Sequence, residues 1–414
     1  MYVLAVIGAL LLVVLAIFAS YFFLKRPEFI VYSYTIILFT QIQSKIPSYF
    51  LVSNGLLIFA YFLTITIILQ FFGKVKKYSF KYVWLIYFSF FLLLIMRIFF
   101  NDVGIFNQTN SLIFILIFYT HVFKSFINSN EKLVHVLHTL VVVQLMVIIG
   151  IFYNLIFDTS SLAQYGDTFR ADALGLNVNT ISTMLALFIP AIIYLKKKYL
   201  SYKHVELISA GIIILSVISM FLTLSRSGLV LLVFLIIYYF VDSIKKFLIV
   251  SCSVCVFGYY IFFISDLPNK YFSIYRFSTI FTFEKNSRTF IWGPYLKVIN
   301  QNKLSGRLLI DDVKSFLDSE DLKNYKASHN SYLGLAFNYG IPFMILYFFP
   351  LIFSLMIKQN DMSFKNMINA MVFIILFRSV VNHDYITLSF ILPILLAIKS
   401  NELYYKNNYL FNNS

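Results

Sequence analysis

The chain has 414 residues, of which 60% are hydrophobic and 12% are charged, whereas an ordinary soluble domain has about 25% charged residues. This composition excludes a soluble globular enzyme. A net charge of +15 would indicate nucleic acid or another acidic partner in a soluble chain. In a membrane protein, basic residues instead mark one side of the bilayer, and we predict no nucleic acid partner.

Apolar stretches recur along the whole chain, and each is long enough to cross a hydrocarbon core about 30 Å thick. The second and the last two stretches are short, so we expect about 12–14 transmembrane helices. In chain order the expected spans lie near residues 2–24, 29–44, 50–72, 82–100, 111–126, 133–157, 178–195, 205–224, 228–241, 247–265, 331–357, 366–381 and 385–398.

This pattern predicts an all-α polytopic membrane protein with three regions. Transmembrane helices with short loops occupy residues 1–266, a large and partly helical external loop domain occupies 267–328, and C-terminal transmembrane helices with a cytoplasmic tail occupy 329–414. No internal repeat of fixed period indicates a solenoid or a transporter built from inverted halves.

Basic residues are distributed unequally between alternate loops. Of the 33 Lys and Arg residues, 18 lie on one set of loops, while the opposite short loops hold only Lys45, Arg170 and Arg226. The positive-inside rule therefore places the 18-residue side, with the C-terminus, in the cytoplasm. The side of the N-terminus depends on whether the short second span is real.

Several kinds of catalytic and transport chemistry have no signature in the chain. There is no Walker or dinucleotide-binding glycine loop, no H-E-x-x-H motif and no Cys/His cluster, so we expect no nucleotide, cofactor or metal. All 18 acidic residues lie in loops or near span ends. Proton-coupled and cation-coupled transporters commonly use carboxylates inside the membrane, so a transporter is disfavoured.

The external side instead carries arginines and one histidine in short polar segments: Arg170, Arg226, Arg288 and His329. A single external Arg usually reaches toward lipid headgroups, and a single His at a span end is usually an interfacial polar residue. Together, however, three guanidinium groups suit phosphate, and His is the side chain best suited to accept a proton near neutral pH. The combination predicts a site that binds a diphosphate at the external membrane surface.

Two further arginines, Arg97 and Arg378, lie inside predicted spans. Each such placement costs about 2.5–3.5 kcal/mol, so the side chain usually faces the bundle interior. We expect Arg97 to reach the nearby span end and Arg378 to pair with Asp384.

Four short motifs in order resemble a known family. Residues 223–228 (TLSRSG), Ser287-Arg288 with Trp292, residues 329–333 (HNSYL) and residues 340–342 (GIP) look like the pattern of the O-antigen ligase and Wzy-type O-antigen polymerase family. The loop that carries Arg170 is similar to the family's upstream loop. The resemblance covers roughly residues 165–345, and the first 160 residues match only as generic spans.

The resemblance implies a metal-independent glycosyltransferase of the bacterial inner membrane, without a cofactor, that uses undecaprenyl-diphosphate-linked oligosaccharide as donor. Its partners would be that lipid-linked glycan, the bilayer and a chain-length regulator. By the same resemblance, Arg170, Arg226 and Arg288 would bind the leaving diphosphate, His329 and Arg288 would be catalytic, and Asn330, Tyr332, Trp292 and Arg378 would support the site.

The sequence favours an O-antigen polymerase that joins lipid-linked repeat units at the periplasmic face. Two alternatives stay open: an O-antigen ligase that transfers glycan to lipid A core, and a lipid-linked glycan flippase. The preference for a polymerase depends on residues 302–307 and an acidic stretch over 311–321, where the external loop departs from the family pattern.

Overall fold

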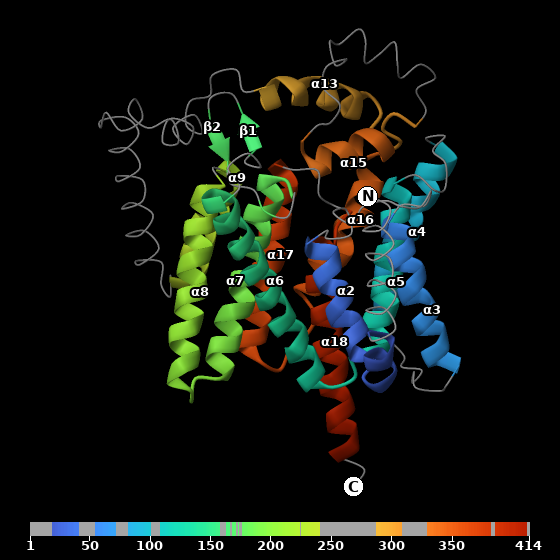
Figure 1. Cartoon of the computed structure of the whole chain (residues 1–414). Coiled ribbons are helices and arrows are strands. Elements are labelled where there is room, and N and C mark those ends of the chain that lie inside the picture. The colour runs from blue at the N-terminus through green and yellow to red at the C-terminus, as the bar shows by residue number, and fades with distance from the viewer. Residues whose placement is uncertain are drawn as a thin grey trace, which may run out of the picture.

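The described part of the chain is a bundle of helices with one short hairpin (Figure 1). A computed structural model describes residues 19–40, 54–71, 82–100, 108–157, 163–165, 168–170, 173, 176–223, 225–240, 287–308, 329–381 and 386–411. The predicted class, an all-α polytopic membrane protein, is confirmed. The hairpin is an unpredicted addition, in which β1 (Ala163–Tyr165) pairs antiparallel with β2 (Thr168–Arg170).

The helix bounds agree closely with most of the predicted spans. In chain order the helices are α2 (Glu28–Thr40), α3 (Asn54–Phe71), α4 (Val83–Phe100), α5 (Gln108–Phe126), α6 (Asn130–Phe157), α7 (Val178–Lys198), α8 (Lys203–Leu222), α9 (Arg226–Phe240), α13 (Ser287–Gln301), α15 (Ser331–Tyr339), α16 (Ile341–Ser354), α17 (Met362–Val381) and α18 (Leu388–Phe411).

Within the described residues, six helices are long and apolar enough to cross a membrane: α4, α5, α6, α7, α8 and α17. A helix is suited to this task because it satisfies every backbone polar group internally, which lipid cannot do. The expected span at 247–265 and most of the one at 2–24 lie outside the described residues.

Two predicted spans have the wrong shape. Residues 331–357 do not form one helix, because α15 ends at Tyr339, Gly340 has a φ of 90°, and α16 starts afresh with Pro342 in its first turn. The last predicted span ends at residue 398, but α18 continues to Phe411. Its polar second half continues the helix because Lys399 bonds to the last turn of α5 and Asn401 bonds to the loop before α17.

Helix α7 occupies the centre of the bundle. It contacts α6, α8, α9 and α17, and 83% of its span is buried, against 28–56% in the other five candidate spans. The helix begins with Asn177, whose side-chain oxygen accepts a hydrogen bond from the Asn179 N–H at 2.9 Å. Midway along the bundle, Gln144 of α6 donates to Ser216 of α8 and to the Leu185 carbonyl of α7, which ties three helices together where lipid offers no polar partner.

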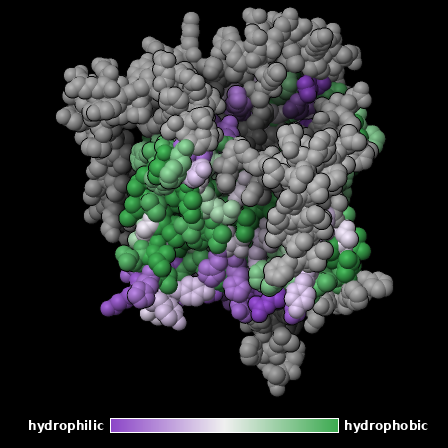
Figure 2. Space-filling view, in the orientation of Figure 1, coloured by the Kyte–Doolittle hydropathy of each residue, from purple (hydrophilic) through white to green (hydrophobic). Residues whose placement is uncertain are grey.

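The two ends of the bundle differ in character. At one end, which we call the basic end, Lys132 pairs with Glu28 at 3.1 Å and Lys196 pairs with Glu206 at 2.8 Å. Figure 2 shows hydrophilic residues gathered at this end below a hydrophobic middle. The hairpin, α13 and α15 lie at the other end (Figure 1). We call it the motif end, because residues 168–170, 225–228, 287–308 and 329–341 lie there.

The contacts of the buried Lys399 side chain should stabilise the basic end. Lys399 is 1% exposed, and its Nζ lies 3.0 Å from Glu402 Oε2 and 3.3 Å from the Lys124 carbonyl oxygen. Lys399→Met leaves both acceptors without this donor, so we expect the free energy of unfolding to fall by about 1–3 kcal/mol. Thermal unfolding in detergent measures the change. The matched Lys358→Met variant removes an exposed cation and should unfold like the parent protein. An equal loss of stability in both variants would contradict a stabilising role for the Lys399 contacts.

Candidate functional site

The structure brings the backbones of all four predicted site residues to the motif end. Arg170 is the last residue of β2, Arg226 is the first residue of α9, and Arg288 is the second residue of α13. His329 precedes α15 by two residues. These segments come from widely separated parts of the chain, and their gathering at one end is what a shared external site requires.

The start of α9 is held against the first turn of α7. The Ser225 hydroxyl donates to the Asn179 side-chain oxygen at 2.8 Å, and it accepts a hydrogen bond from the Gly228 N–H at 3.3 Å. Ser225 is fully buried and satisfies an N–H group that the first turn of a helix leaves without an intrahelical partner. The serines of the TLSRSG motif therefore position the backbone from which Arg226 extends.

Gly228 allows α9 to approach α7 closely. A Cβ atom at this position would lie 2.6 Å from the Cβ of Ser182, closer than real Cβ atoms come. The glycine of the motif is therefore a packing residue, as small residues are wherever membrane helices pack closely.

Arg378 joins the same polar region from α17. It is 4% exposed, and its Nη2 donates to the Thr180 hydroxyl at 3.4 Å, one residue along α7 from Asn179. The ion pair expected with Asp384 falls on a residue outside the described part of the chain. Arg378 thus lies in the bundle interior, next to the α7 turn that also holds Ser225.

Arg97, the other arginine within a span, links two helices near their ends. Its Nε donates to the side-chain oxygen of Asn110 at 2.9 Å, which joins the last turn of α4 to the first turn of α5. This contact explains how the helix accommodates the charge.

His329 is presented at the surface by an unusual backbone. It is exposed and has a φ of 50°, in the left-handed region that is uncommon for residues other than glycine, although Asn, Asp and His adopt it more often than most. Asn330 caps α15 by accepting from the Leu333 N–H at 3.0 Å. Tyr332 donates to the Leu376 carbonyl at 3.0 Å and so fastens α15 to α17. Asn330 and Tyr332 thereby hold the segment that carries His329.

Helix α13 packs on α15 through a small apolar cluster. Tyr295, Val298 and Ile299 of α13 contact Ala336 and Phe337 of α15, and the rings of Tyr295 and Phe337 lie 4.4 Å apart. Trp292, predicted to support the site, is half-buried on the same helix, four residues after Arg288. The cluster fixes the helix that carries Arg288 against the helix that follows His329.

The turn after α13 strengthens this attachment by direct backbone contact. The Arg307 N–H donates to the Phe337 carbonyl at 2.7 Å, and the Ile341 N–H donates to the Lys303 carbonyl at 2.9 Å. A Cβ on Gly306 would lie 2.4 Å from the Phe337 carbonyl oxygen, and a Cβ on Gly340 would lie 2.0 Å from the Leu304 carbonyl oxygen. Both glycines have positive φ angles, so they serve the conformation as well as the close approach.

Sequence reasoning missed this glycine-mediated attachment. The signal was present in two places: a glycine before Ile341-Pro342, and a glycine within residues 302–307. Neither glycine indicates by itself which segment approaches it. The acidic stretch over 311–321 lies outside the described residues.

Metal chemistry has no cluster to support it in the part of the chain that the structure describes. No group of three or more His, Cys, Asp or Glu side chains lies close enough there to hold a metal ion.

The comparison with known families agrees with this geometry. Residues 210–348 match the family model described as O-antigen ligase. The matched region contains Arg226, Arg288 and His329, whereas Arg170 and Arg378 lie outside it. No curated protein and no solved structure matches the chain.

The fold and the match together define the class of protein. The chain is a polytopic membrane protein, and its residues 210–348 match the O-antigen ligase family model. This match supports the resemblance to the O-antigen ligase and Wzy family that the four motifs indicated. Members of this family are membrane glycosyltransferase-like enzymes.

From the close backbone contact at Gly340, we predict that alanine destabilises the protein at this position and not at an open glycine of α13. Gly340→Ala should lower the free energy of unfolding by at least about 1–3 kcal/mol, because the new methyl group meets the backbone and the φ angle is unfavourable. Gly293→Ala is the matched control, since a Cβ there meets nothing within 4 Å and alanine favours the helix. Thermal unfolding in detergent compares the two variants, and a Gly340→Ala protein as stable as Gly293→Ala would refute the contact.

Proposed function

We propose that the protein is an O-antigen polymerase, which transfers a glycan from undecaprenyl diphosphate to the acceptor sugar of another lipid-linked repeat unit at the periplasmic face. The observation that carries the proposal is the family match over residues 210–348, which contains Arg226, Arg288 and His329. Support also comes from the fold, because these residues and Arg170 belong to segments that lie at the same end of the bundle.

The proposed reaction needs cations more than it needs a cofactor. The bond between the anomeric carbon and the diphosphate oxygen breaks, and a bond from the acceptor oxygen to that carbon forms. Negative charge grows on the departing diphosphate, and cations preorganised around it lower the barrier. Arg170, Arg226 and Arg288 supply this charge in the proposal, with a planar fork that suits phosphate. The diphosphate linkage provides the driving force, so neither nucleotide nor metal is required.

His329 takes the proton of the acceptor hydroxyl in this mechanism. Imidazole suits the role because its ordinary pKa of about 6.5 lies near the working pH. Its exposure at the motif end leaves it accessible to an acceptor, and the cap made by Asn330 restrains the backbone beside it. In this proposal Arg378, Tyr332 and Trp292 position the elements around the site.

The polymerase is preferred to the ligase because residues 302–307 depart from the family pattern. These residues form the turn that fixes α13 to α15, the helix that follows His329. A different turn would change the surroundings of the acceptor sugar, as we expect for an enzyme matched to its own repeat unit. The ligase reaction would use the same donor and the same arginines, with lipid A core as the acceptor.

A reconstituted reaction distinguishes the candidates. Purified protein in liposomes should lengthen lipid-linked repeat units in the presence of a metal chelator and without nucleotide. Elongation that needs added lipid A core would establish the ligase instead. Movement of the unmodified repeat unit across the bilayer, without elongation, would establish the flippase.

Substitutions in the same assay test the proposed roles. Arg288→Ala should slow elongation about 10²–10³-fold by removing a stabilising cation, and Arg288→Lys should restore it only in part because it lacks the planar fork. His329→Asn should slow elongation about 10²–10⁴-fold, while asparagine tolerates the left-handed backbone. The Lys358→Ala control removes an exposed cation between α16 and α17 and should leave the rate unchanged. Full activity of both Arg288→Ala and His329→Asn would show that the proposed site is wrong.

We also propose that the basic end and the C-terminus face the cytoplasm of a bacterial inner membrane, with the motif end in the periplasm. The basis for this orientation is the excess of Lys and Arg in the loops of the basic end.

We also propose a chain-length regulator as the protein partner.

Cysteine accessibility tests the orientation without altering any charge. In a Cys252→Ala, Cys255→Ala background, Leu304→Cys and Tyr202→Cys place single thiols at exposed positions of the motif end and the basic end. We expect a membrane-impermeant maleimide to label Leu304→Cys in spheroplasts and Tyr202→Cys only after permeabilisation. The reverse pattern would invert the topology.

A further inference from the structure

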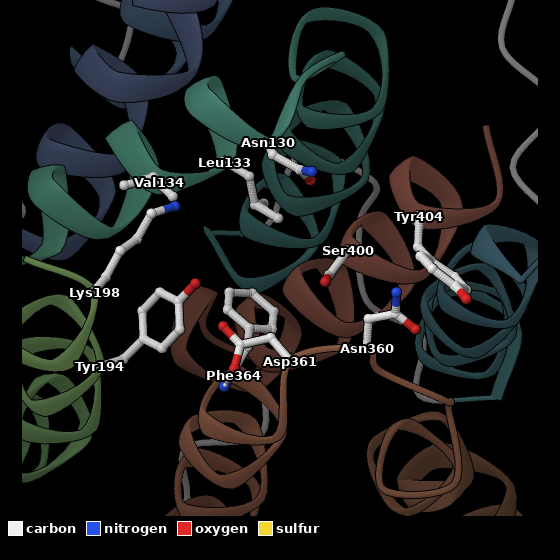
Figure 3. Close-up of a pocket in the computed structure, with 10 residues that line it drawn as sticks. All are labelled: Asn130, Leu133, Val134, Tyr194, Lys198, Asn360, Asp361, Phe364, Ser400 and Tyr404. Carbon is white, nitrogen blue, oxygen red and sulfur yellow. Dashed lines mark hydrogen bonds between the residues drawn. The ribbon is translucent and has the colours of Figure 1, made fainter. Parts of the chain in front are cut away.

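A cavity of about 390 Å³ lies at the basic end, between α6, α7, α18 and the turn that precedes α17 (Figure 3). It is remote from the motif residues, because the 21 residues of α7 separate the two ends by about 31 Å. Nothing in the proposed glycan transfer uses this cavity, so its lining has to be explained separately.

The cavity has a polar rim and an aromatic floor. Lys198, Asn360 and Asp361 are exposed at the rim, whereas Tyr194 and Phe364 are buried below them. The two floor rings meet edge to face with centroids 5.2 Å apart. A ligand that fits this arrangement presents an apolar surface inward and polar groups to the rim.

The charges of the rim lie on separate walls. Figure 3 shows Lys198 on the α7 side and Asp361 on the α17 side, with the Tyr194 hydroxyl between them. Asp361 Oδ1 accepts from the Ser363 N–H at 2.8 Å and the Phe364 N–H at 3.3 Å, so the start of α17 stabilises its negative charge. Lys198 therefore attracts an anion to its side of the cavity. Asp361, on the opposite side, repels an anion but accepts hydrogen bonds from hydroxyl groups.

We propose that this cavity binds a phosphate ester with a neighbouring polyol, the chemistry of a phosphoglycerol headgroup. The phosphate would lie against Lys198, and the glycerol hydroxyls would bond with Asp361, Asn360 and the Ser400 hydroxyl that faces the same space. The carbon side of the glycerol packs on the Tyr194 and Phe364 rings. Basic residues between helices at a membrane surface commonly bind anionic headgroups, and Lys198 is the basic residue of this cavity.

Size and charge separate this ligand from simpler ones. A volume of about 390 Å³ suits one headgroup and is too small for several turns of a helix about 10 Å across. A bare phosphate would meet the repulsion of Asp361 without gaining the hydroxyl contacts. The ligand therefore needs both functional groups.

Lipid retention tests the assignment with the full-length protein. Protein in nanodiscs of phosphatidylcholine doped with phosphatidylglycerol or phosphatidic acid is released and analysed by native mass spectrometry. We expect phosphatidylglycerol to be retained most, then phosphatidic acid, which lacks the glycerol hydroxyls, and then phosphatidylcholine. Lys198→Ala should reduce phosphatidylglycerol retention about tenfold. Lys197→Ala, which removes an adjacent exposed cation outside the cavity, should leave it unchanged.

A second variant and a soluble probe complete the test. Asp361→Asn keeps a residue that caps helices equally well, and it should abolish the preference for phosphatidylglycerol over phosphatidic acid. Calorimetry with glycerol 3-phosphate distinguishes the sources: a soluble ester that binds in the cavity and is lost with Lys198→Ala identifies a free metabolite as the ligand. Equal retention of all three lipids without glycerol 3-phosphate binding, or equal losses with Lys197→Ala and Lys198→Ala, would overturn the proposal.

Discussion

The burial of α7 on all sides is the constraint on which the rest of the structure depends. A helix with 83% of its span inside the bundle gives lipid almost no contact, so its polar side chains must find partners on neighbouring helices. At one end the Asn179 side-chain oxygen accepts a hydrogen bond from the Ser225 hydroxyl, and the Thr180 hydroxyl accepts one from Arg378. At the other end Tyr194 and Lys198 line the cavity of the basic end. One helix therefore positions both candidate sites.

A second constraint acts at the motif end, where backbone meets backbone. Gly306 and Gly340 allow the turn after α13 to contact α15 without side chains between them. Tyr332 then joins α15 to α17, and Arg378 joins α17 to α7. The segments that carry Arg288 and His329 are thus attached, through packed helices, to the same central support. A site that must stabilise developing charge benefits from such rigidity, because the catalytic groups then need no reorganisation during the reaction.

The candidate site could be predicted only in part. Short motifs around Arg226, Arg288 and His329 indicated the family whose model matches residues 210–348, because residue types and their order can be read from the sequence alone. The supporting contacts could not be predicted. Ser225 and Asn179 are 46 residues apart, and Thr180 and Arg378 are 198 residues apart, and no local pattern encodes a pairing over such distances. Asn330 is the exception: an N-cap is a local interaction and can be inferred from a polar residue before an apolar run.

Sequence alone determined the class of protein, the approximate helix bounds and the division of charge between two sets of loops, since each follows from the local match between apolar length and bilayer thickness. It did not determine the break at Gly340, the hairpin that ends at Arg170, or the extension of α18 to Phe411. Each of these depends on what lies beside the segment in space. A glycine breaks a helix where another backbone must approach, and a polar segment stays helical where neighbouring elements satisfy its side chains, so only the tertiary structure could decide them.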